Sequence, residues 1–379
     1  MVLRSKYTQS EPMDITTVRK NYPALAEQTY LNTASCGLVS EATAAAAQQF
    51  YQELLEQGGA PRNDWYAQIP ALRQEVATWL GTEADEVALL PNFSVACNYV
   101  TRAFTDYSRV LLLDSDYSSL TLPWLLPDYQ VHYFSAAPNG AIDLNGLEEQ
   151  VKKYRIEILA ISHVQYASGF CIDLETLGRC CRDWGVLLVI DATQSLGVVP
   201  IDLRTAPIDV LIGSGYKWMT AGFGNALLFV RRALHDRLKA PAVGNNSFDD
   251  PATVRSRDDL PFSTRLLEVG HYNFASLWAL RQAVRELQAL GQAAIYQRVQ
   301  ALVTYLYEHL PATVGVVSDY APANHSGITV LRGGSELERA LLEQKIITSA
   351  RPQGLRISLH FYNNKADIDH LCQALTTIQ

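Results

Sequence analysis

The sequence predicts an α/β protein whose mostly parallel sheet is covered by helices on both faces. Short apolar runs alternate with helical stretches through the middle of the chain, which is the pattern of β–α–β units. The chain has 379 residues, 48% of them hydrophobic, which is enough for a large core and more than one folding unit. A stretch rich in Pro, Gly, Asn and Asp at residues 240–264 indicates a loop between two domains.

Seven short apolar runs are the candidate strands of the sheet. They are Val87–Leu90, Arg109–Leu113, Val131–Phe134, Ile156–Ile161, Leu187–Ile190, Val210–Ile212 and Asn225–Val230. The helical stretches are Ser94–Thr105, Leu144–Lys153, Leu174–Trp184 and, after the loop, Ser276–Leu290. The residues from about 292 to the C-terminus are expected to form a smaller α+β domain.

A glycine-rich turn containing one lysine follows the strand expected to end at Ile212. Lys217 is the single lysine of the turn, Gly213–Gly224, and Asp191 directly follows the preceding strand. In parallel sheets, ligands bind at the carboxyl ends of strands. Pyridoxal phosphate (PLP) needs an amine for a Schiff base and an anion beside its pyridine nitrogen. The sequence therefore predicts a PLP site; a solvated loop lysine and a satisfied strand-end carboxylate are the simpler alternatives.

Five segments of the chain resemble the class V aminotransferase family, which includes cysteine desulfurases, kynureninases, isopenicillin N epimerase and serine–glyoxylate aminotransferases. The resemblance spans most of the chain in the family's order. It implies PLP fold type I, with a seven-stranded mostly parallel sheet flanked by helices and a smaller α+β C-terminal domain. The segments are Thr29–Ala34, Ser162–Gly169, Val189–Gly197, Ser214–Lys217 and Leu355–Asn363.

The same resemblance implies that the chain is divided into three parts. Residues 1–28 are expected to pack with the small domain, and residues 29–262 to form the large PLP-binding domain. Residues 263–379 are expected to contain the interdomain helix and the small C-terminal domain.

Around the cofactor ring, the resemblance assigns a role to each of four residues. Lys217 forms the Schiff base and then moves the substrate proton as a general base and acid. Asp191 keeps the pyridine nitrogen protonated, and Gln194 reaches the phenolic oxygen. Tyr117 stands where desulfurases carry a ring-stacking histidine, and its flat ring can still stack. An ordinary surface glutamine and a packed tyrosine are the alternatives for the last two.

The cofactor phosphate is expected at the start of the helix after Pro91, where backbone N–H groups favour an anion. Phe93 would donate its backbone N–H and Ser94 its hydroxyl, although Asn92 or Ser94 could equally be a plain helix cap. Ser214 and Tyr216 are expected to add hydroxyl donors.

The turn Gly270–Asn273 resembles the family segment that reaches the phosphate of a neighbouring subunit. His271 and Asn273 are therefore candidate cofactor-binding residues, and a homodimer with both sites at the interface is expected. Tyr166 is another cofactor candidate; for Tyr166 and His163, a hydrogen bond to cofactor or substrate competes with simple packing.

Arg356 and Thr33 are the candidate substrate-binding residues. Arg356 lies within the apolar segment Leu355–Ser358, and a buried arginine needs a partner. Its planar guanidinium suits a substrate carboxylate, while a structural salt bridge is the alternative.

The reaction is expected to take place at Cα of a small amino acid, most simply as a transamination. The segment 345–354 contains no cysteine, whereas desulfurases carry a nucleophilic cysteine there, so desulfuration is disfavoured. The alternatives are a β-eliminating C–S lyase, an amino-acid epimerase, or a binding protein that has lost catalysis.

Composition excludes several other classes of function. The net charge of −8 and the pI near 5.5 argue against nucleic-acid binding. No apolar run is long enough to span a membrane, and Met1–Tyr7 lacks the apolar core of a signal peptide, so a cytoplasmic location is expected. The six cysteines show no CxxC spacing, which indicates free thiols and no metal site.

Overall fold

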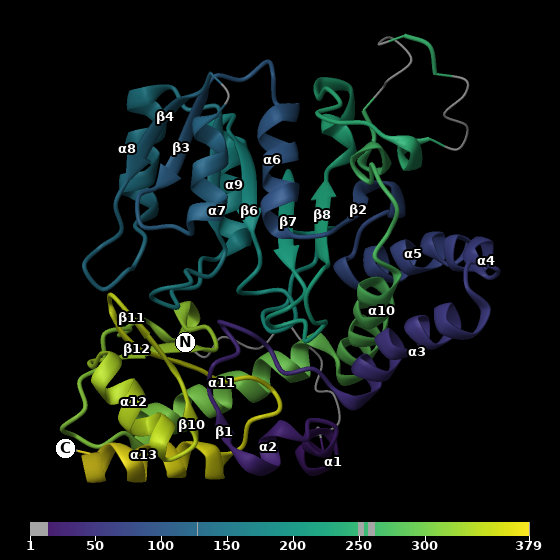
Figure 1. The fold of residues 1–379 in the computed structure, drawn as a ribbon. Helices are drawn as coiled ribbons and strands as arrows, with labels where there is room; N and C mark the ends of the chain where they lie inside the picture. The colour runs from purple at the N-terminus through teal and green to yellow at the C-terminus, as the bar shows by residue number, and fades with distance from the viewer. Residues whose placement is uncertain (1–13, 127, 249–253, 257–261, 379) are drawn as a thin grey trace.

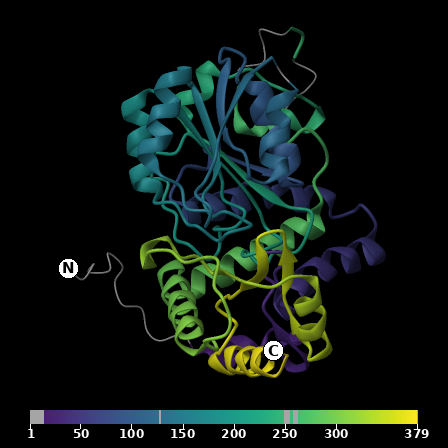
Figure 2. The same cartoon turned by 90° about the vertical axis from the view of Figure 1, so that its left-hand side faces the viewer.

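The structure is a computed structural model that describes residues 14–126, 128–248, 254–256 and 262–378. In Figure 1 the large sheet occupies the upper part of the molecule and the C-terminal strands and helices occupy the lower part. Figure 2 shows the same division from the side, with the yellow C-terminal helix at the base.

Seven strands form the large sheet in the order β2-β8-β7-β6-β5-β3-β4. Only β8 runs antiparallel to its neighbours, so the predicted seven-stranded, mostly parallel sheet is confirmed. Three of the strands extend slightly past their predicted ends, to Ser162, Asp191 and Ser214. The strands are β2 (Val87–Leu90), β3 (Arg109–Leu113), β4 (Gln130–Phe134), β5 (Ile158–Ser162), β6 (Leu187–Asp191), β7 (Val210–Ser214) and β8 (Ala226–Val230).

Helices cover both faces because alternate side chains of a strand point to opposite sides. In β3, Leu111 packs in the core beneath α5, α8 and α9, whereas Val110 and Leu112 pack beneath α6 and α7. These helices are α5 (Ile69–Leu80), α6 (Phe93–Ala103), α7 (Ser118–Thr121), α8 (Leu144–Tyr154) and α9 (Leu174–Trp184).

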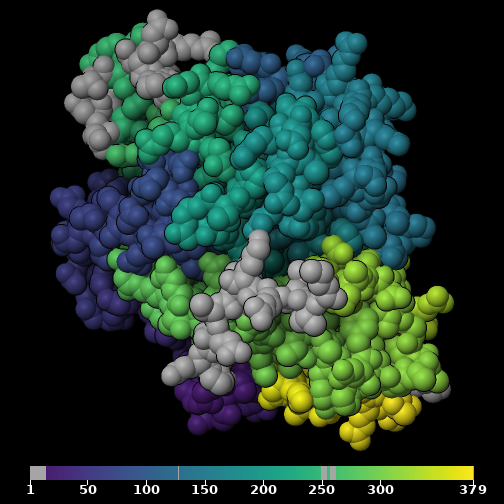
Figure 3. Space-filling view, turned by 180° about the vertical axis from the view of Figure 1, so that it is seen from behind, coloured from purple at the N-terminus to yellow at the C-terminus, as the bar shows by residue number. Residues whose placement is uncertain are grey.

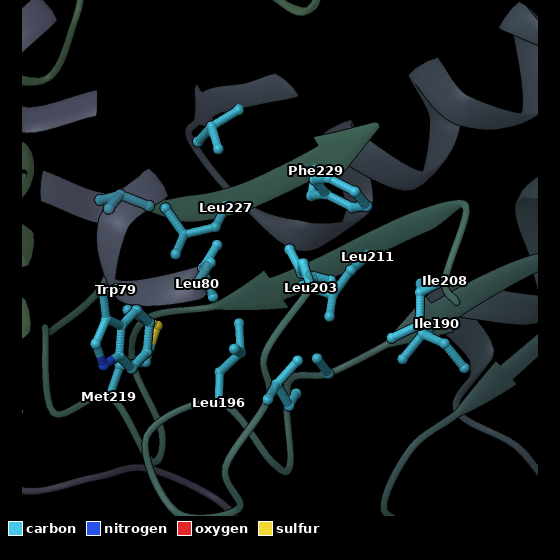
Figure 4. Close-up of a cluster of buried hydrophobic side chains, with 14 of the residues drawn as sticks. Trp79, Leu80, Ile190, Leu196, Leu203, Ile208, Leu211, Met219, Leu227 and Phe229 are labelled. Carbon is cyan, nitrogen blue, oxygen red and sulfur yellow. The ribbon is translucent and has the colours of Figure 1, made fainter. Parts of the chain in front are cut away.

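The first of these cores reaches the turn that carries the lysine. Figure 4 shows Met219 and Leu196 in the same cluster as Leu80 of α5 and Leu227 of β8. Met219 is completely buried, so a residue close to Lys217 is fixed by the packing of the large sheet.

The C-terminal part has its own small sheet and its own core, as predicted. Three antiparallel strands are ordered β11-β12-β9, and Val330, Leu355 and Ile357 of this sheet pack with α11 and α13. The elements are α11 (Gln292–His309), β9 (Ile328–Leu331), α12 (Ser335–Glu343), β10 (Ile346–Ile347), β11 (Ser349–Arg351), β12 (Gly354–Ser358) and α13 (Lys365–Ile378).

The N-terminal segment packs against this C-terminal part. Arg19 forms an ion pair with Asp367 at 2.8 Å, and Figure 3 shows purple N-terminal residues beside the yellow helix. Strand β1 (Thr29–Tyr30) pairs with β10, and Leu31 is buried in the C-terminal core. Residues on both sides of the predicted boundary at residue 28 thus contact the C-terminal part. Residues 1–13 lie outside the described residues; the helices here are α1 (Ile15–Lys20) and α2 (Ala24–Glu27).

Helix α10 runs from the large sheet to the small domain and packs against α3 and α5. The boundary predicted at residue 262 falls just before a turn whose Thr264 hydroxyl donates to the carbonyls of Asp85 and Val87. That turn thus packs on the large sheet. The remaining helices are α3 (Glu41–Gln57), α4 (Arg62–Ala67) and α10 (Phe274–Leu290), with the short turns η1 (Ala84–Glu86), η2 (Leu122–Leu125), η3 (Arg232–Arg237), η4 (Asn245–Ser247), η7 (Thr264–Leu267) and η8 (Pro322–Asn324).

Within the described residues, no helix has the length and apolar character that a membrane crossing requires. The six cysteines are free thiols. No cluster of metal-ligating side chains occurs in the part of the chain that the structure describes.

Candidate active site

Three adjacent parallel strands place polar side chains at one edge of the sheet. Ser162, Asp191 and Ser214 are the last residues of β5, β6 and β7, and Ser162 lies directly beside Asp191 in the strand register. All three side chains are buried. Buried polar groups at this edge mark it as the place where the fold accepts a ligand.

Lys217 is held from both sides of its turn. Trp218, next to it, is buried in the core of the small domain, and Met219 is buried in the core of the large domain. The N–H of Gly37 donates to the carbonyl of Tyr216 at 2.9 Å. A Cβ at Gly37 would lie 1.9 Å from the carbonyl oxygen of Lys217, so only glycine permits this approach.

The Lys217 amine is buried between two tyrosine rings. Its Nζ lies 5.5 Å from the ring centre of Tyr117 and 5.4 Å from that of Tyr216. Burial lowers the pKa of Lys217; the charge of Asp191 opposes this shift, whereas Arg356 and Arg351 add to it. The pKa of Lys217 falls to about 8, so the neutral, nucleophilic amine forms at lower pH than for an exposed lysine.

Asp191 is a buried carboxylate with little compensation. Its Oδ1 accepts a hydrogen bond from the N–H of Thr193 at 2.8 Å. Burial raises the pKa of Asp191; Asp116 raises it further and Lys217 lowers it. Among the described residues Asp191 has no ion pair. A cationic ring nitrogen would stabilise this carboxylate, so the donor chemistry fits PLP.

Asp116 is a part of the site that sequence reasoning missed. Its carboxylate accepts hydrogen bonds from the N–H and hydroxyl of Ser162, at 2.8 and 2.6 Å, and from the N–H of Tyr117 at 2.7 Å. It thereby joins the end of β5 to the tyrosine expected over the cofactor. An acidic residue three positions after strand β3 was the available signal.

Tyr117 and Tyr166 pack edge to face, with ring centres 5.3 Å apart. Tyr117 is 38% exposed, so part of its ring remains free to stack. The contact places Tyr166 beside the predicted cofactor position, while its carbonyl oxygen accepts a hydrogen bond from Arg356.

Gln194 already has two partners. Its Nε2 donates to the carbonyl of Ala34 at 3.0 Å, and its Oε1 accepts from the indole N–H of Trp218 at 2.7 Å. One amide hydrogen is left for the predicted contact with the cofactor. His163 instead turns to Cys171, 3.6 Å from its Nε2, and burial lowers the pKa of His163 to about 4, so it packs as a neutral ring.

At the predicted phosphate position, Asn92 is the cap of α6 and accepts from the N–H of Val95 at 2.9 Å. The Phe93 side chain is buried in the core, so only its backbone can face a ligand. The Ser94 hydroxyl is exposed and donates to Ser119 at 3.2 Å. The amides of a first helical turn have no partner inside the helix, which suits a phosphate.

The two other predicted phosphate donors occupy different settings. The N–H of Ser214 donates to the hydroxyl of Thr193 at 3.3 Å, and its side chain is buried at the end of β7. Tyr216 stacks on Phe223 at 4.6 Å, and burial raises the pKa of Tyr216 to about 12. Its hydroxyl therefore remains protonated and able to donate.

The turn Gly270–Asn273 lies beside Gly224, the last residue of the lysine turn: Asn273 Nδ2 would be 3.2 Å from a Cβ at Gly224. His271 Nδ1 lies 2.6 Å from the hydroxyl of Tyr66, and Asn273 caps α10 by accepting from the N–H of Ser276. Both residues line a cavity of about 240 Å³ together with Pro91. Their contact with the cofactor of a partner subunit stays a prediction.

Arg356 is almost completely buried, and its partners are neutral oxygens. Nη1 donates to the carbonyl of Tyr166 at 2.7 Å and Nη2 to the hydroxyl of Ser35 at 2.6 Å. The described residues supply no carboxylate to it, so the alternative of a structural salt bridge finds no support. Thr33 is fully buried and bonded to Tyr362; its neighbour Ser35, missed by sequence reasoning, meets the arginine instead.

With this geometry in view, the chain belongs to the class V aminotransferase family, whose model matches residues 29–371. The uncharacterized aminotransferase YcbU of Bacillus subtilis (strain 168) is 27% identical over 363 residues, covering 93% of this chain and 95% of the relative. The apo structure of a cysteine desulfurase from Thermococcus onnurineus NA1 superposes with a TM-score of 0.87 at 20% identity, covering 98% and 99% of the two chains.

A third comparison bears on the cofactor. A mutant of C-DES with glycine covalently linked to PLP has a TM-score of 0.85 at 20% identity, covering 94% of this chain and 98% of that chain. The fold is thus PLP fold type I and the family's cofactor is PLP. Several relatives are named cysteine desulfurases. The comparisons therefore do not support the expectation against desulfuration.

Proposed function

We propose that this protein is a PLP-dependent aminotransferase acting at Cα of a small amino acid. The observation that carries the proposal is that one site contains a buried amine, a buried carboxylate and a buried guanidinium without an ion-pair partner among the described residues. These are Lys217, Asp191 and Arg356. Together they supply the attachment point, the anion for the ring nitrogen and the carboxylate receptor that the reaction needs.

The residues proposed to hold the cofactor surround Lys217. Asp191 would bind the ring nitrogen, Tyr117 and Tyr166 would cover the ring, and Gln194 would use its remaining amide hydrogen. The phosphate would be bound by the backbone of Phe93 with Ser94, Ser214 and Tyr216, and by His271 and Asn273 of a partner subunit. When bound, PLP supplies the electron sink for the charge that develops at Cα.

The chain's own groups then account for proton movement and orientation. Arg356 would bind the α-carboxylate through two parallel hydrogen bonds and so fix the position of Cα. Lys217, whose pKa burial lowers to about 8, would accept the Cα proton and return it. Tyr117 and Tyr166 would limit the access of water to this proton.

The hairpin before Arg356 supports transamination over desulfuration. Only Pro352 and Gln353 separate β11 from β12, and the hairpin carries no thiol. A persulfide-forming nucleophile would have to come from elsewhere.

Cleavage of a C–S bond is the second candidate, and Cys36 is the observation that favours it. This half-buried thiol lies close enough to Lys217 for their charges to interact: burial raises the pKa of Cys36 and Lys217 lowers it. Several relatives are named cysteine desulfurases. Epimerisation, and binding without catalysis, remain further alternatives.

A screen of amino acids against the purified holoprotein tests the proposal. Transamination converts the cofactor to its amine form, seen in the absorbance spectrum, and releases a keto acid while the amino group stays on the cofactor. Sulfide release would instead assign C–S cleavage, and loss of chirality without keto acid would assign epimerisation. If the cofactor absorbance responds to no amino acid, the protein is a binding protein.

We also propose a homodimer with both sites at the interface, because the turn Gly270–Asn273 resembles the family segment that reaches the phosphate of a neighbouring subunit. Sedimentation of the holoprotein should show two chains. A fully active monomer at the assay concentration would overturn the assembly. The cytoplasmic location stays a prediction.

A further inference from the structure

Two arginines, not one, occupy the substrate side of the site. Arg351 lies on β11 and Arg356 on β12, and the register of this pair sets Ser349 opposite Arg356. Arg351 is two residues further along the same strand as Ser349, so both guanidinium groups project from the same face as diagonal neighbours. The hairpin therefore delivers two positive charges to one place.

Both guanidinium groups converge on a single neutral oxygen. Arg351 Nη2 lies 3.1 Å and Arg356 Nη2 lies 2.6 Å from the hydroxyl oxygen of Ser35. Neither arginine has a carboxylate partner among the described residues, and the buried Nε of each has no hydrogen-bond partner there. Two like charges that share only a hydroxyl leave hydrogen-bond donors free for an anion.

The two arginines also differ in depth. Arg356 is 1% exposed, whereas Arg351 is half-buried. Burial lowers the pKa of Arg356 to about 9, with Arg351 as the next cause, and both arginines lower the pKa of Lys217. Arg351 thus acts on the same reacting amine as Arg356 but lies nearer to solvent.

A single carboxylate does not account for both groups. One carboxylate pairs in bidentate fashion with one guanidinium and neutralises one charge, which leaves a second, partly desolvated cation in the site. An amino acid with an acidic side chain supplies one anion to each arginine. The inner anion would be the α-carboxylate and the outer anion the side-chain group.

We propose that the substrate is an amino dicarboxylic acid, with Arg356 binding its α-carboxylate and Arg351 binding its side-chain carboxylate. This assignment rests on the proposed function for the identity of the reacting group. It does not depend on which reaction follows at Cα, because recognition of two carboxylates precedes any proton transfer.

Calorimetric titration of the holoprotein with carboxylates that lack an amino group tests the assignment. Glutarate and its monocarboxylate counterpart, pentanoate, have the same number of carbons. Wild-type protein should bind glutarate at least about tenfold more tightly than pentanoate, the ratio that one extra charged contact supplies. Arg351→Gln should abolish this preference and change pentanoate binding by less than about threefold. Arg332→Gln removes an exposed arginine just after β9 and should keep the preference.

Three results would overturn the assignment. One is the absence of a preference for glutarate in the wild type, and another is its survival in Arg351→Gln. The third is an equal loss of glutarate and pentanoate binding in Arg351→Gln, which would mean that both arginines share one carboxylate. The cofactor absorbance confirms that the variant remains folded and loaded, and Arg351→Lys, which keeps the charge, should restore part of the preference.

This test separates the assignment from the proposed reaction. The protein could show a glutarate preference that depends on Arg351 and yet release no keto acid from any amino acid. This result would overturn the proposed aminotransferase reaction and support the substrate class. Transamination of neutral amino acids without a glutarate preference would support the aminotransferase and overturn the proposed substrate class.

Discussion

The two sides of the candidate site are built on different principles. On the large-domain side, Asp191 ends β6 and Lys217 follows β7; their opposite charges moderate each other's pKa. On the small-domain side, Arg351 and Arg356 lie on a hairpin and carry charges of the same sign with a hydroxyl between them. We call the first side, with one acidic and one basic group, the balanced side, and the second, with two positive groups and no carboxylate partner among the described residues, the unbalanced side.

The difference teaches which function each side can serve. A balanced, deeply buried pair suits a permanently bound cofactor, because its charges need no exchange with solvent. An unbalanced pair that reaches towards solvent suits a ligand that arrives and leaves. Ser35 and Gly37 of one N-terminal segment touch both sides, so that segment couples them.

The largest effect expected is on the balanced side, from Lys217→Ala. The substitution removes the amine proposed to attach the cofactor, so turnover should fall to background. Mass spectrometry after borohydride reduction should find no cofactor on the peptide with position 217. A reduced adduct on another lysine would show that the attachment point was misassigned.

Asp191→Ala should be next in size. Loss of the anion beside the ring nitrogen should cost about 2–4 kcal/mol of transition-state stabilisation, or roughly 10²–10³ in kcat. Steady-state kinetics of the loaded variant measure this loss. Asp183→Ala, an exposed carboxylate on α9, is the control and should behave like wild type; near-normal turnover in Asp191→Ala would falsify the role.

On the unbalanced side, Arg356→Lys keeps the charge but loses the planar pair of donors. We expect kcat/KM for amino acids to fall by about 10–100-fold, which corresponds to roughly 1.4–2.8 kcal/mol, with the cofactor spectrum unchanged. Amines without a carboxylate should lose far less. An equal loss for both kinds of substrate would make Arg356 a scaffold residue.

A substitution at Gly37 should disturb the N-terminal segment that contacts both sides. A methyl group there would meet the carbonyl of Lys217, so Gly37→Ala should destabilise the fold by about 1–3 kcal/mol and disturb cofactor binding. Chemical denaturation and cofactor titration measure the two effects. At Gly59 no atom lies within 4 Å of an added Cβ, and Gly59→Ala should therefore change stability by under about 0.5 kcal/mol.

The smallest effect expected is electrostatic communication between the sides. Lys217 is faced by Asp191 and Cys36, which raise its pKa, and by Arg356 and Arg351, which lower it. Arg351→Gln removes one positive charge that repels the ammonium form of Lys217. The substitution should therefore raise the pKa of Lys217. Labelling of the Lys217 amine in the apoprotein, followed by mass spectrometry across pH, should then reach half of its maximal rate at a higher pH than in wild type. An unchanged profile would mean that the two sides do not communicate.

The sequence by itself determined the sheet, and it was enough to propose Asp191 and Lys217 on one side of the site. Apolar runs such as Arg109–Leu113 form strands at the predicted positions because a strand covered by helices on both faces is a nearly continuous apolar run. Asp191 was predicted as a site residue because it directly follows such a run, and Lys217 because it lies in the turn after the next one; parallel strands end at one edge. The pairing of β1 with β10 of the C-terminal part depends on contacts between distant segments that no local pattern encodes.

Only the tertiary structure decided the other side. Arg351 was visible as a residue but not as a partner of Arg356, and Ser35 meets Arg351 across 316 positions of the chain. Cys36 and Asp116 likewise join the site through packing of distant segments. Charge and spacing along a chain do not reveal whether an arginine will find a carboxylate; that depends on which groups the folded core desolvates and which it leaves without a partner.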